Sequence, residues 1–485
     1  MKLNQLTIKE ASKLLQEKKI TSVELTKACL ARIKEVDGKI KACLTVCEKE
    51  ALAEAKRADE MIKRGEKSEL LGIPYIAKDN ILTKGIRTTA ASKILENYIA
   101  PFDATIIKKL KKAGAVLLAK ANLDEFAHGA STENSAYGPT HNPWDLTRVA
   151  GGSSGGPAAA VAADMCIFAL GTDTGGSIRC PASFCSVVGL KPTYGRSSRF
   201  GLMAMTSSTD VPGPITKTVE DAAIILKAMA GHDKNDATTP AEKVPDYCQE
   251  LSSDSELSSL KIGVPEEFFQ GADKGVKEAV EKAIEKLKDL GAKIIPIKLP
   301  HAKYGIPVYY IITPSEVSSN LARFDGIKYG LSVKESKDLQ EVYFKSRGKG
   351  FGPEAKRRIM LGTYALSAGY FDAYYLQAQK VRTIIKNELD SELKKLDAIA
   401  TPVQPGTAFK IGEQVDDPLK MYLEDLFVAP ASLAGLPAIS VPAGFSKGLP
   451  VGMQIIGRRF DEGMLFRIGH QFEKATKWHE KKPVV

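Results

Sequence analysis

The segment from residue 151 to residue 190 carries the residue types that acyl transfer requires. It holds eight glycines and five serines, whereas only three of its side chains carry a charge. Glycines let backbone N–H groups approach one point closely, and a serine hydroxyl becomes a nucleophile once a base removes its proton. This nearly uncharged stretch therefore predicts an acyl-transfer site in which backbone N–H groups stabilise an oxyanion.

Three other interpretations of this segment are weaker. Segments rich in glycine and serine are most often flexible linkers, but here the glycines flank the apolar runs AAAVAA and CIFALG. No lysine stands where a phosphate-binding loop requires one. Residues 151–155 fit the GxSxG nucleophile elbow, which needs an apolar strand directly before it. The preceding residues NPWDLTRVA make a poor buried strand, so this match is weak.

The general base that such a serine needs has two kinds of candidate. A Ser-His-Asp triad is defined by geometry and not by sequence position, so the histidines stay open as bases. Lys78 follows the apolar run 73–77, which predicts a buried strand, and ligand chemistry in α/β folds lies at the carboxyl ends of strands. A lysine there is also typical of a solvated strand end, but Ser–Lys pairs are an established variant of the triad. The histidines are His128, His141, His232, His301, His470 and His479.

The chain resembles the amidase signature family, whose members use a Ser-Ser-Lys triad without histidine. The resemblance rests on GGSSGG at residues 151–156, DTGGSIR at 173–179 and the strand-end Lys78, and further matching segments spread over nearly the whole chain. Two departures are visible. His128 stands where the family commonly has methionine, and residues 207–214 read SSTDVPGP where SSLDQIGP is more usual.

This resemblance implies that the chain hydrolyses the side-chain amide of glutamine. Ser177 would be the nucleophile, Ser153 the proton relay and Lys78 the general base. Lysine is a base only when neutral, so its pKa must fall from about 10.4 toward about 7, and burial in an uncharged pocket supplies that shift. Asp79 would oppose the shift if it pointed inward, but alternation along the strand directs it to the other side.

The resemblance also assigns an oxyanion hole and a substrate pocket. The α-carboxylate of glutamine needs a cation, which one of two neighbouring arginines would supply, and the α-amino group needs an anion. These arginines lie on a helix rich in basic residues, where a solvent-exposed role is equally expected. The assigned residues are Thr174, Gly175 and Gly176, with the N–H of Ser177, for the oxyanion hole, and Ser131, Tyr309, Arg357, Arg358 and Asp425 for the substrate.

The resemblance further implies that the released ammonia serves a larger assembly. A tRNA-handling partner would use it, with ATP and Mg²⁺, to convert Glu-tRNA(Gln) and often Asp-tRNA(Asn), and a small third component would hold the pair together. No cofactor is implied for this chain itself. A stand-alone amidase of the same family and a histidine-dependent α/β-hydrolase remain alternatives. The net charge of +10 suits a polyanion, but the lysines are dispersed, so tRNA is expected to bind mainly through the partners.

Composition predicts a cytoplasmic protein without membrane contact. The longest apolar runs are far short of the roughly 18 residues of a membrane span, and the start MKLNQLTIKE lacks the apolar core of a signal peptide. The seven cysteines have no metal-ligand spacing and are expected to be free thiols in a reducing compartment.

The elements that must position these residues alternate between strands and helices. This alternation predicts an α/β fold, and the resemblance makes it one large domain over 1–485, the amidase signature fold, with a mixed, largely parallel sheet covered by helices on both faces. Residues 1–66 are expected to be helical, including Cys43 and Cys47, with 71–232 as the catalytic core. Residues 233–260 form a polar surface excursion and 261–485 the remaining sheet, with helices over 305–390 covering the site. The expected strands lie near 73–77, 115–119, 167–171, 187–190, 261–264, 293–297, 397–401, 438–442 and 452–456.

Overall fold

An 11-stranded sheet forms the centre of the molecule, in the order β1-β3-β2-β6-β8-β7-β12-β13-β11-β9-β10. This computed structural model describes residues 2–251 and 257–485, so part of the polar excursion expected over 233–260 lies outside the described residues. A separate two-stranded sheet pairs β4 with β5. The strands are β1 (Cys43–Val46), β2 (Pro74–Lys78), β3 (Val116–Ala121), β4 (His141–Asn142), β5 (Asp145–Val149), β6 (Phe168–Asp173), β7 (Val188–Lys191), β8 (Val211–Thr216), β9 (Lys261–Pro265), β10 (Lys293–Ile297), β11 (Ala398–Pro402), β12 (Ala438–Ser446) and β13 (Leu449–Ile456).

The sheet is mixed, as the sequence predicts, but its parallel pairs are confined to two flanks. β2 runs parallel to β3 and β6, and β9 runs parallel to β10 and β11. The strands between these flanks are antiparallel to their neighbours. A short connection such as the one between β12 and β13 can join only antiparallel strands. The expected largely parallel pairing therefore holds only at the flanks.

All nine strands predicted from apolar runs are present, displaced or extended by a few residues. The prediction of a helix over Cys43 and Cys47 is wrong, because residues 43–46 form the edge strand β1, which pairs with β3. Thr45 and Val46 are β-branched and favour a strand, yet four residues are too few to show a periodicity. The N-terminal region is therefore helical except for this strand.

Strand β8 was not predicted, because its sequence VPGPIT contains two prolines. Proline cannot donate to a ladder and argues against a central strand. In the structure Pro212 and Pro214 pair with β6, whereas β7 pairs only with Ile215 and Thr216. The prolines therefore lie outside the residues through which β8 pairs with β7.

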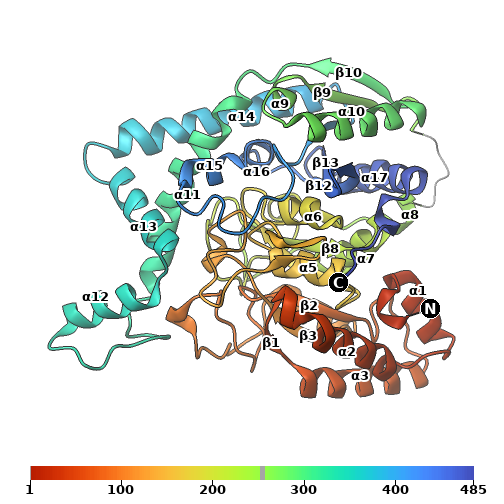
Figure 1. Cartoon of the computed structure of the whole chain (residues 1–485), viewed down its shortest axis with the longest axis horizontal. Coiled ribbons are helices and arrows are strands. Elements are labelled where there is room, and N and C mark those ends of the chain that lie inside the picture. The colour runs from red at the N-terminus through yellow and green to blue at the C-terminus, as the bar shows by residue number, and fades with distance from the viewer. Residues whose placement is uncertain (1, 252–256) are drawn as a thin grey trace.

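Helices connect these strands and surround the sheet (Figure 1). α1 and α2 each begin with a capping box, in which a threonine and a glutamate bond reciprocally. The helices are α1 (Ile8–Gln16), α2 (Ser22–Ile40), α3 (Glu48–Lys63), α4 (Thr105–Lys112), α5 (Gly155–Ala162), α6 (Arg179–Cys185), α7 (Val219–Met229), α8 (Tyr247–Leu251), α9 (Glu267–Gln270), α10 (Lys274–Asp289), α11 (Gly305–Asn320), α12 (Leu339–Gly350), α13 (Pro353–Ala365), α14 (Gln377–Leu393), α15 (Pro418–Leu423), α16 (Ala429–Leu433) and α17 (Glu462–Thr476), with a π-helical turn at Phe371–Leu376.

Both faces of the sheet are covered by helices. Neighbouring residues of a strand point to opposite faces, so Met453 and Gln454 of β13 mark the two sides. Gln454 accepts a hydrogen bond from Arg179 of α6. Val441, the β12 partner of Met453, lies beside Gly469 of α17. α5 packs with α6 on one face, and α7 packs with α17 on the other.

The helical region expected over residues 305–390 is present as α11 to α14. α11 packs against both α13 and α14, so these helices form one unit. Figure 1 shows α12 and α13 extending at one side of the molecule, away from the N-terminal helices. Across residues 2–251 and 257–485, no helix is both long enough and apolar enough to cross a membrane.

Candidate active site

Lys78 ends strand β2 and is fully buried beneath the serine-rich segment. Its Nζ donates to Oγ of Ser153 at 2.7 Å, to Oγ of Ser154 at 2.8 Å and to Oγ1 of Thr172 at 3.0 Å. Burial disfavours the ammonium form and lowers the pKa of Lys78 to about 7. The lysine that the sequence places at a strand end therefore lies against two serine hydroxyls, in a state that can exchange protons near neutral pH.

Asp79 points away from this cluster, as strand alternation predicts. Its carboxylate accepts from the backbone N–H and the hydroxyl of Thr89, at 2.7 and 2.6 Å. It also lies 3.5 Å from Nζ of Lys120 in a fully buried ion pair. The negative charge next to Lys78 in the sequence is thus directed to another lysine.

The two neighbouring serines of the GGSSGG segment have different surroundings. The hydroxyl of Ser154 donates to the carbonyl of Thr172 at 3.2 Å, whereas among the described residues Oγ of Ser153 is hydrogen-bonded only to Nζ of Lys78. The backbone N–H of Ser154 donates to the carbonyl of Ser177 at 3.0 Å, which joins the two serine-bearing loops. Ser177 is 7% exposed while Ser153 and Ser154 are fully buried. Ser177 is therefore the serine of this group that solvent reaches.

Glycine is required where these loops approach their neighbours. A Cβ atom on Gly152 would overlap the carboxylate of Asp124 and the backbone of Ser131. The same carboxylate accepts from the backbone N–H groups of Thr132 and Asn134, at 2.8 and 3.1 Å. Asp124 therefore clamps the loop that carries Ser131 onto the serine loop.

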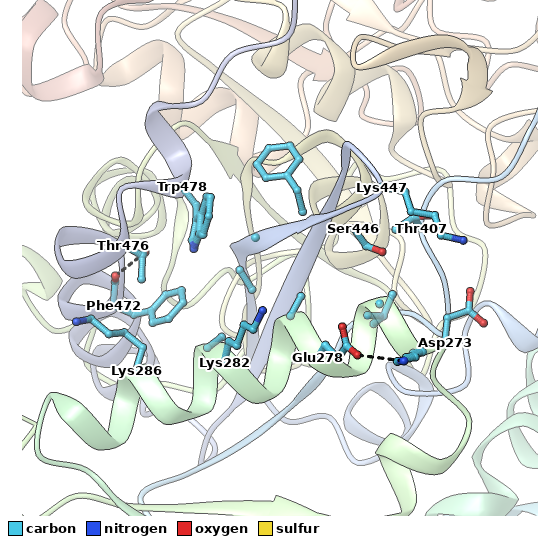
Figure 2. A pocket seen from close by; sticks show the side chains of 18 residues that line it. Asp273, Glu278, Lys282, Lys286, Thr407, Ser446, Lys447, Phe472, Thr476 and Trp478 are labelled. Carbon is cyan, nitrogen blue, oxygen red and sulfur yellow. Dashed lines mark hydrogen bonds and ion pairs between the residues drawn. The ribbon is translucent and has the colours of Figure 1, made fainter.

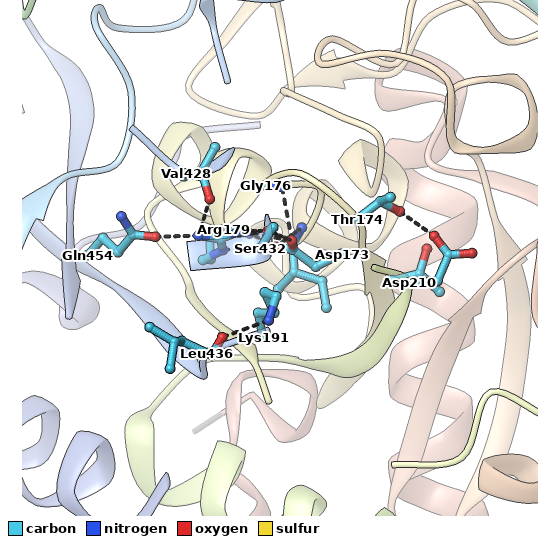
Figure 3. Close-up of polar contacts among 12 residues, drawn as sticks. Asp173, Thr174, Gly176, Arg179, Lys191, Asp210, Val428, Ser432, Leu436 and Gln454 are labelled. Atoms are coloured by element: carbon cyan, nitrogen blue, oxygen red, sulfur yellow. Dashed lines mark hydrogen bonds and ion pairs between the residues drawn. The ribbon is translucent and has the colours of Figure 1, made fainter. Parts of the chain in front are cut away.

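The loop between β6 and α6 is held by one buried carboxylate (Figure 3). Asp173 accepts from the backbone N–H of Gly176 at 2.9 Å and from that of Ile178 at 3.1 Å. It also forms a fully buried ion pair with Arg179, with Nη2 at 2.9 Å from Oδ1. Arg179 in turn donates to the carbonyl of Val428 at 3.1 Å and to Oγ of Ser432 at 2.7 Å. The loop before Ser177 is thus fixed to the C-terminal part of the chain.

The backbone amides expected to form an oxyanion hole differ in their availability. The N–H of Gly176 is engaged by Asp173. Within the described part of the chain, the N–H groups of Thr174, Gly175 and Ser177 have no hydrogen-bond acceptor. The hydroxyl of Thr174 donates to Asp210 at 2.7 Å, which fixes the start of the loop (Figure 3).

The two candidate arginines on α13 have different environments. Arg358 is 2% exposed, and its Nε donates to Oε1 of Glu354 at 2.8 Å. Its guanidinium lies 5.2 Å from the ring centre of Tyr310 and 5.6 Å from that of Tyr422. The side chain of Arg357 is 41% exposed and contacts the other oxygen of Glu354. Arg358 is therefore the one that is held rigidly inside the protein.

Asp425 and Tyr309 lie close to this arginine and to the glycine loop. Asp425 accepts a hydrogen bond from the hydroxyl of Tyr310 at 2.8 Å, and burial raises its pKa to about 7. The ring of Tyr309 packs on Gly175 so closely that a Cβ atom there would overlap it. Aromatic side chains of α11 therefore connect the substrate candidates to the loop of Ser177.

A small space of about 40 Å³ separates α13 from the loop after β3. It is lined by Ser131, Arg357 and Arg358, which the sequence analysis assigned to the substrate, and by Glu354 and Tyr422, which it did not. Glu354 could have been found from its spacing, because an acid three and four residues before two arginines pairs with both on a helix. No comparable signal marks Tyr422.

A much larger groove lies elsewhere in the described structure. It holds about 930 Å³ between α10 and the β12–β13 hairpin, with Lys282, Lys286 and Trp478 among its lining residues (Figure 2). None of the residues assigned to catalysis or substrate binding lines it. The buried cluster of Lys78 and the serines is therefore separate from this groove.

The histidines do not approach the serines. All six lie in the described part of the chain, and none is hydrogen-bonded to Ser153, Ser154 or Ser177. His301 pairs with Glu388 at 2.8 Å, for example, and His128 has no partner at either ring nitrogen. Among residues 2–251 and 257–485, no three His, Cys, Asp or Glu side chains form a group that could hold a metal ion.

Comparison with known proteins identifies the family. A family model described as Amidase matches residues 24–466. The A subunit of glutamyl-tRNA(Gln) amidotransferase from Caldanaerobacter subterraneus subsp. tengcongensis is 57% identical over 486 positions, covering 100% of this chain and 99% of that protein. The protein of the same name from Carboxydothermus hydrogenoformans is 54% identical, with 100% of each chain covered.

Solved structures agree with this assignment. The A subunit of glutamyl-tRNA(Gln) amidotransferase from Thermotoga maritima superposes with a TM-score of 0.81 at 49% identity, covering 97% of this chain and 95% of that one. The peptide amidase from Stenotrophomonas maltophilia gives a TM-score of 0.83 at 30% identity, covering 97% of each chain. The chain belongs to the amidase family, the amidase signature family that its motifs resemble.

Proposed function

We propose that this chain is the glutaminase component, the A subunit, of a glutamyl-tRNA(Gln) amidotransferase. The contact that carries the proposal is the 2.7 Å hydrogen bond between buried Lys78 and Ser153, in a loop joined to that of Ser177. Full-length similarity to the A subunits of such enzymes gives the substrate class. In this role the chain hydrolyses glutamine and delivers ammonia.

Ser177 is the nucleophile in this proposal. Its hydroxyl attacks the side-chain amide carbon of glutamine, its proton passes to Ser153, and Ser153 passes a proton to neutral Lys78. The tetrahedral intermediate then collapses as the C–N bond breaks, and the proton returns through Ser153 to the departing ammonia. Water hydrolyses the resulting acyl-enzyme by the same relay in reverse. Burial supports this cycle because it keeps the pKa of Lys78 at about 7, where the lysine can accept and release the proton.

The backbone amides of Thr174, Gly175 and Ser177 stabilise the oxyanion. They lack acceptors among the described residues, and the bonds of Asp173 to the loop hold them in place before substrate arrives. Removal of one such donor typically costs about 2.7–4 kcal/mol of transition-state stabilisation. Gly176 contributes through its lack of a side chain, because a Cβ atom there would overlap Val428.

Arg358 binds the α-carboxylate of glutamine and Asp425 binds its α-amino group. Arg358 is the better candidate of the two arginines because its guanidinium is buried, where a charge pair is weakly screened. Arg357, which is more exposed, lies at the edge of the same space. Ser131 and Tyr309 complete the pocket from the loop after β3 and from α11.

The ammonia passes to partners. A tRNA-handling subunit uses it, with ATP and Mg²⁺, to amidate Glu-tRNA(Gln), and a small third subunit joins the two. The names of the relatives support an assembly of several subunits. We assign tRNA binding mainly to the partners and no cofactor to this chain. We place the complex in the cytoplasm, where aminoacyl-tRNA is used.

Substitution of Ser177 by alanine tests this division of labour. In the assembled complex we expect Ser177→Ala to abolish glutamine-dependent conversion of Glu-tRNA(Gln) while conversion supported by ammonium salts is retained, because only the ammonia source requires this serine. If the variant also loses the ammonium-supported reaction, the proposal is wrong. Efficient glutamine hydrolysis by the chain alone, without effect of partners or tRNA, would instead favour a stand-alone amidase.

A further inference from the structure

Glu125 is a buried carboxylate that joins the loop after β3 to the start of helix α13. Its side chain lies in a residue that is only 2% exposed. Both carboxylate oxygens accept from the backbone N–H of Gly352, at 3.2 and 2.9 Å. Oε1 also accepts from the hydroxyl of Ser92 at 2.5 Å. The mechanism described above leaves this buried acid without a role.

Helix α13 depends on Glu125 because it has no cap of its own. Its N-cap residue, Gly352, has no side chain that could accept a backbone N–H of the first turn. Glu125 approaches this helix start from a distant part of the sequence, and the positive end of the helix dipole favours a carboxylate there. A Cβ atom on Gly352 would lie 2.6 Å from Oε2 of Glu125, so only glycine permits this approach.

The junction between α12 and α13 has few other polar links to the catalytic core. Within residues 2–251 and 257–485, every hydrogen bond between 122–135 and 346–365 ends on Glu125. The hydroxyl of Ser92 adds a contact of 3.2 Å to the carbonyl of Gly350. Phe126, directly after Glu125, has a positive φ of 48°. Such a conformation persists only where the surroundings hold it, and it is typical of functional sites.

The two sides of the substrate space are both fixed at this point of the backbone. Helix α13 brings Arg358 to one side, within two turns of Gly352, and Ser131 lies on the other. Asp124, next to Glu125, clamps the loop of Ser131 by accepting the N–H of Thr132 at 2.8 Å. Adjacent carboxylates therefore hold the opposite walls of one small space, although Glu125 does not itself line it.

We propose that Glu125 is a positioning residue for substrate binding, which holds α13 so that Arg358 faces the pocket at the distance that glutamine requires. The inference rests on the proposed glutaminase function, because it takes the α-carboxylate of glutamine as the ligand of Arg358. Loss of Glu125 releases the helix start and moves the cation, while Lys78 and the serines keep their own contacts. The binding of substrate therefore weakens and the chemical step does not change.

The test measures KM and kcat for L-glutamine with the assembled complex. We expect Glu125→Ala to raise KM about tenfold, the contribution of one hydrogen bond to a charged group, with kcat within about twofold of wild type. Glu125→Gln keeps an acceptor for the N–H of Gly352 and should recover most of the affinity. Ser92→Ala removes a single hydroxyl and should raise KM about threefold. This milder variant keeps the test decisive if Glu125→Ala does not fold.

Asp221→Ala is the matched control for a loss of stability. Asp221 is also a fully buried carboxylate at a helix start, where it accepts the N–H of Ile8 at 2.9 Å. It lies on α7, on the other face of the sheet from α6. Both alanine variants should lower Tm, but only Glu125→Ala should raise KM. A lower Tm with unchanged KM, or a fall in kcat alone, would reduce Glu125 to a structural residue.

A second substitution shows whether Glu125 acts through Arg358. In an Arg358→Ala background, Glu125→Ala should change kcat/KM for glutamine by less than about twofold, because no cation is left to position. An equal loss in both backgrounds would overturn the role of Glu125 and leave the glutaminase assignment intact. Failure of the wild-type complex to hydrolyse glutamine would overturn both.

Discussion

Two strands of the sheet end in a buried lysine, and the two ends have different surroundings. Lys78 ends β2 and Lys191 ends β7, and burial lowers the pKa of both to about 7. Nζ of Lys78 meets the hydroxyls of Ser153 and Ser154. Within the described part of the chain, Nζ of Lys191 donates only to backbone carbonyls, of Leu436 at 2.7 Å and of Pro192 at 3.2 Å. A hydroxyl can pass on a proton, whereas a carbonyl can only accept a hydrogen bond.

The comparison shows that a lowered pKa does not by itself mark a catalytic lysine. Burial lowers the pKa of both lysines. The hydrogen-bond partner of each lysine then determines whether the lowered pKa can serve catalysis. Lys191 ties strand β7 to the segment before β12 and holds the sheet together. The pKa of Lys78 is lowered in the same way, but its Nζ lies next to the hydroxyl of Ser153, the proposed proton relay. Four sets of substitutions test the roles assigned to these residues and to the loops around them.

The largest effect is expected at Lys78 itself. Lys78→Ala and Lys78→Arg should both lower kcat/KM for glutamine on the order of 10⁴-fold or more, because neither side chain can take a proton near neutral pH. Lys191→Met, in contrast, should retain activity, and its kcat/KM should still rise with pH through about 7 as Lys78 loses its proton. Steady-state glutaminase assays from pH 5.5 to 9 on folded variants measure both. An active Lys78→Arg enzyme would assign this lysine a purely electrostatic role.

Alanine substitutions of Ser153 and Ser154 distinguish the proposed proton relay from its neighbour. Ser153→Ala should cost about 10²–10⁴-fold in kcat/KM, since it removes the hydroxyl that only Lys78 contacts. Ser154→Ala should be tolerated far better, because that hydroxyl also bonds the carbonyl of Thr172 and has a structural role. Little change in Tm is expected for the first variant. The reverse order of activities would move the relay to Ser154.

Asp210 should have an intermediate effect, through the loop before Ser177. Its carboxylate accepts from Thr174 at 2.7 Å and from the backbone N–H groups of Met205 and Thr206, at 2.9 and 3.1 Å. Asp210→Asn loses an acceptor for one of these donors and should lower kcat about tenfold with KM little changed. Asp236→Asn, at a carboxylate that accepts the N–H groups of Arg199 and Thr238, is the matched control. A fall in Tm with unchanged kcat would reduce Asp210 to a structural residue.

The smallest effect concerns stability at Lys191. Its pKa is about 7 in the folded chain and about 10.4 when unfolded, so the unfolded chain binds more protons between these values. The wild type therefore gains stability from this residue as pH rises from 7 to 10. Lys191→Met has no titrating group at this position. The free energy of unfolding of the variant minus that of the wild type should therefore be most positive near pH 6 and decrease toward pH 10. Urea titrations at both pH values measure the difference, and Lys274→Met, at a side chain that is 91% exposed, should show no such trend.

The sequence predicted the half of the site that lies on strand ends and glycine loops. Lys78 follows an apolar run that forms β2, and the serines lie in a segment whose lack of charge reflects its burial. Strand alternation also predicted correctly that the side chain of Asp79 points away from Lys78. These features are local, so a pattern of a few residues contains them.

The other half depends on packing between distant helices. Arg357 and Arg358 are adjacent on α13, and only the contact of α13 with α11 decides which of them is buried. Tyr310 reaches Asp425 across 115 residues of sequence, with no spacing rule to reveal it. Strand β8 was missed for a related reason, since its prolines lie outside the residues that pair with β7, which the local sequence does not reveal.

Arg179 binds residues of the C-terminal region, and these contacts can form only late in the synthesis of the chain. Arg179 lies in α6 but bonds Val428, Ser432 and Gln454, which leave the ribosome some 250 residues later. Until that part emerges, the loop before Ser177 keeps the local bonds of Asp173 but lacks the contacts that tie it to the C-terminal region. A growing chain therefore carries Ser177, the proposed nucleophile, for much of its synthesis in an incomplete site. The proposed glutaminase activity is accordingly expected only after β13, which carries Gln454, has joined the sheet.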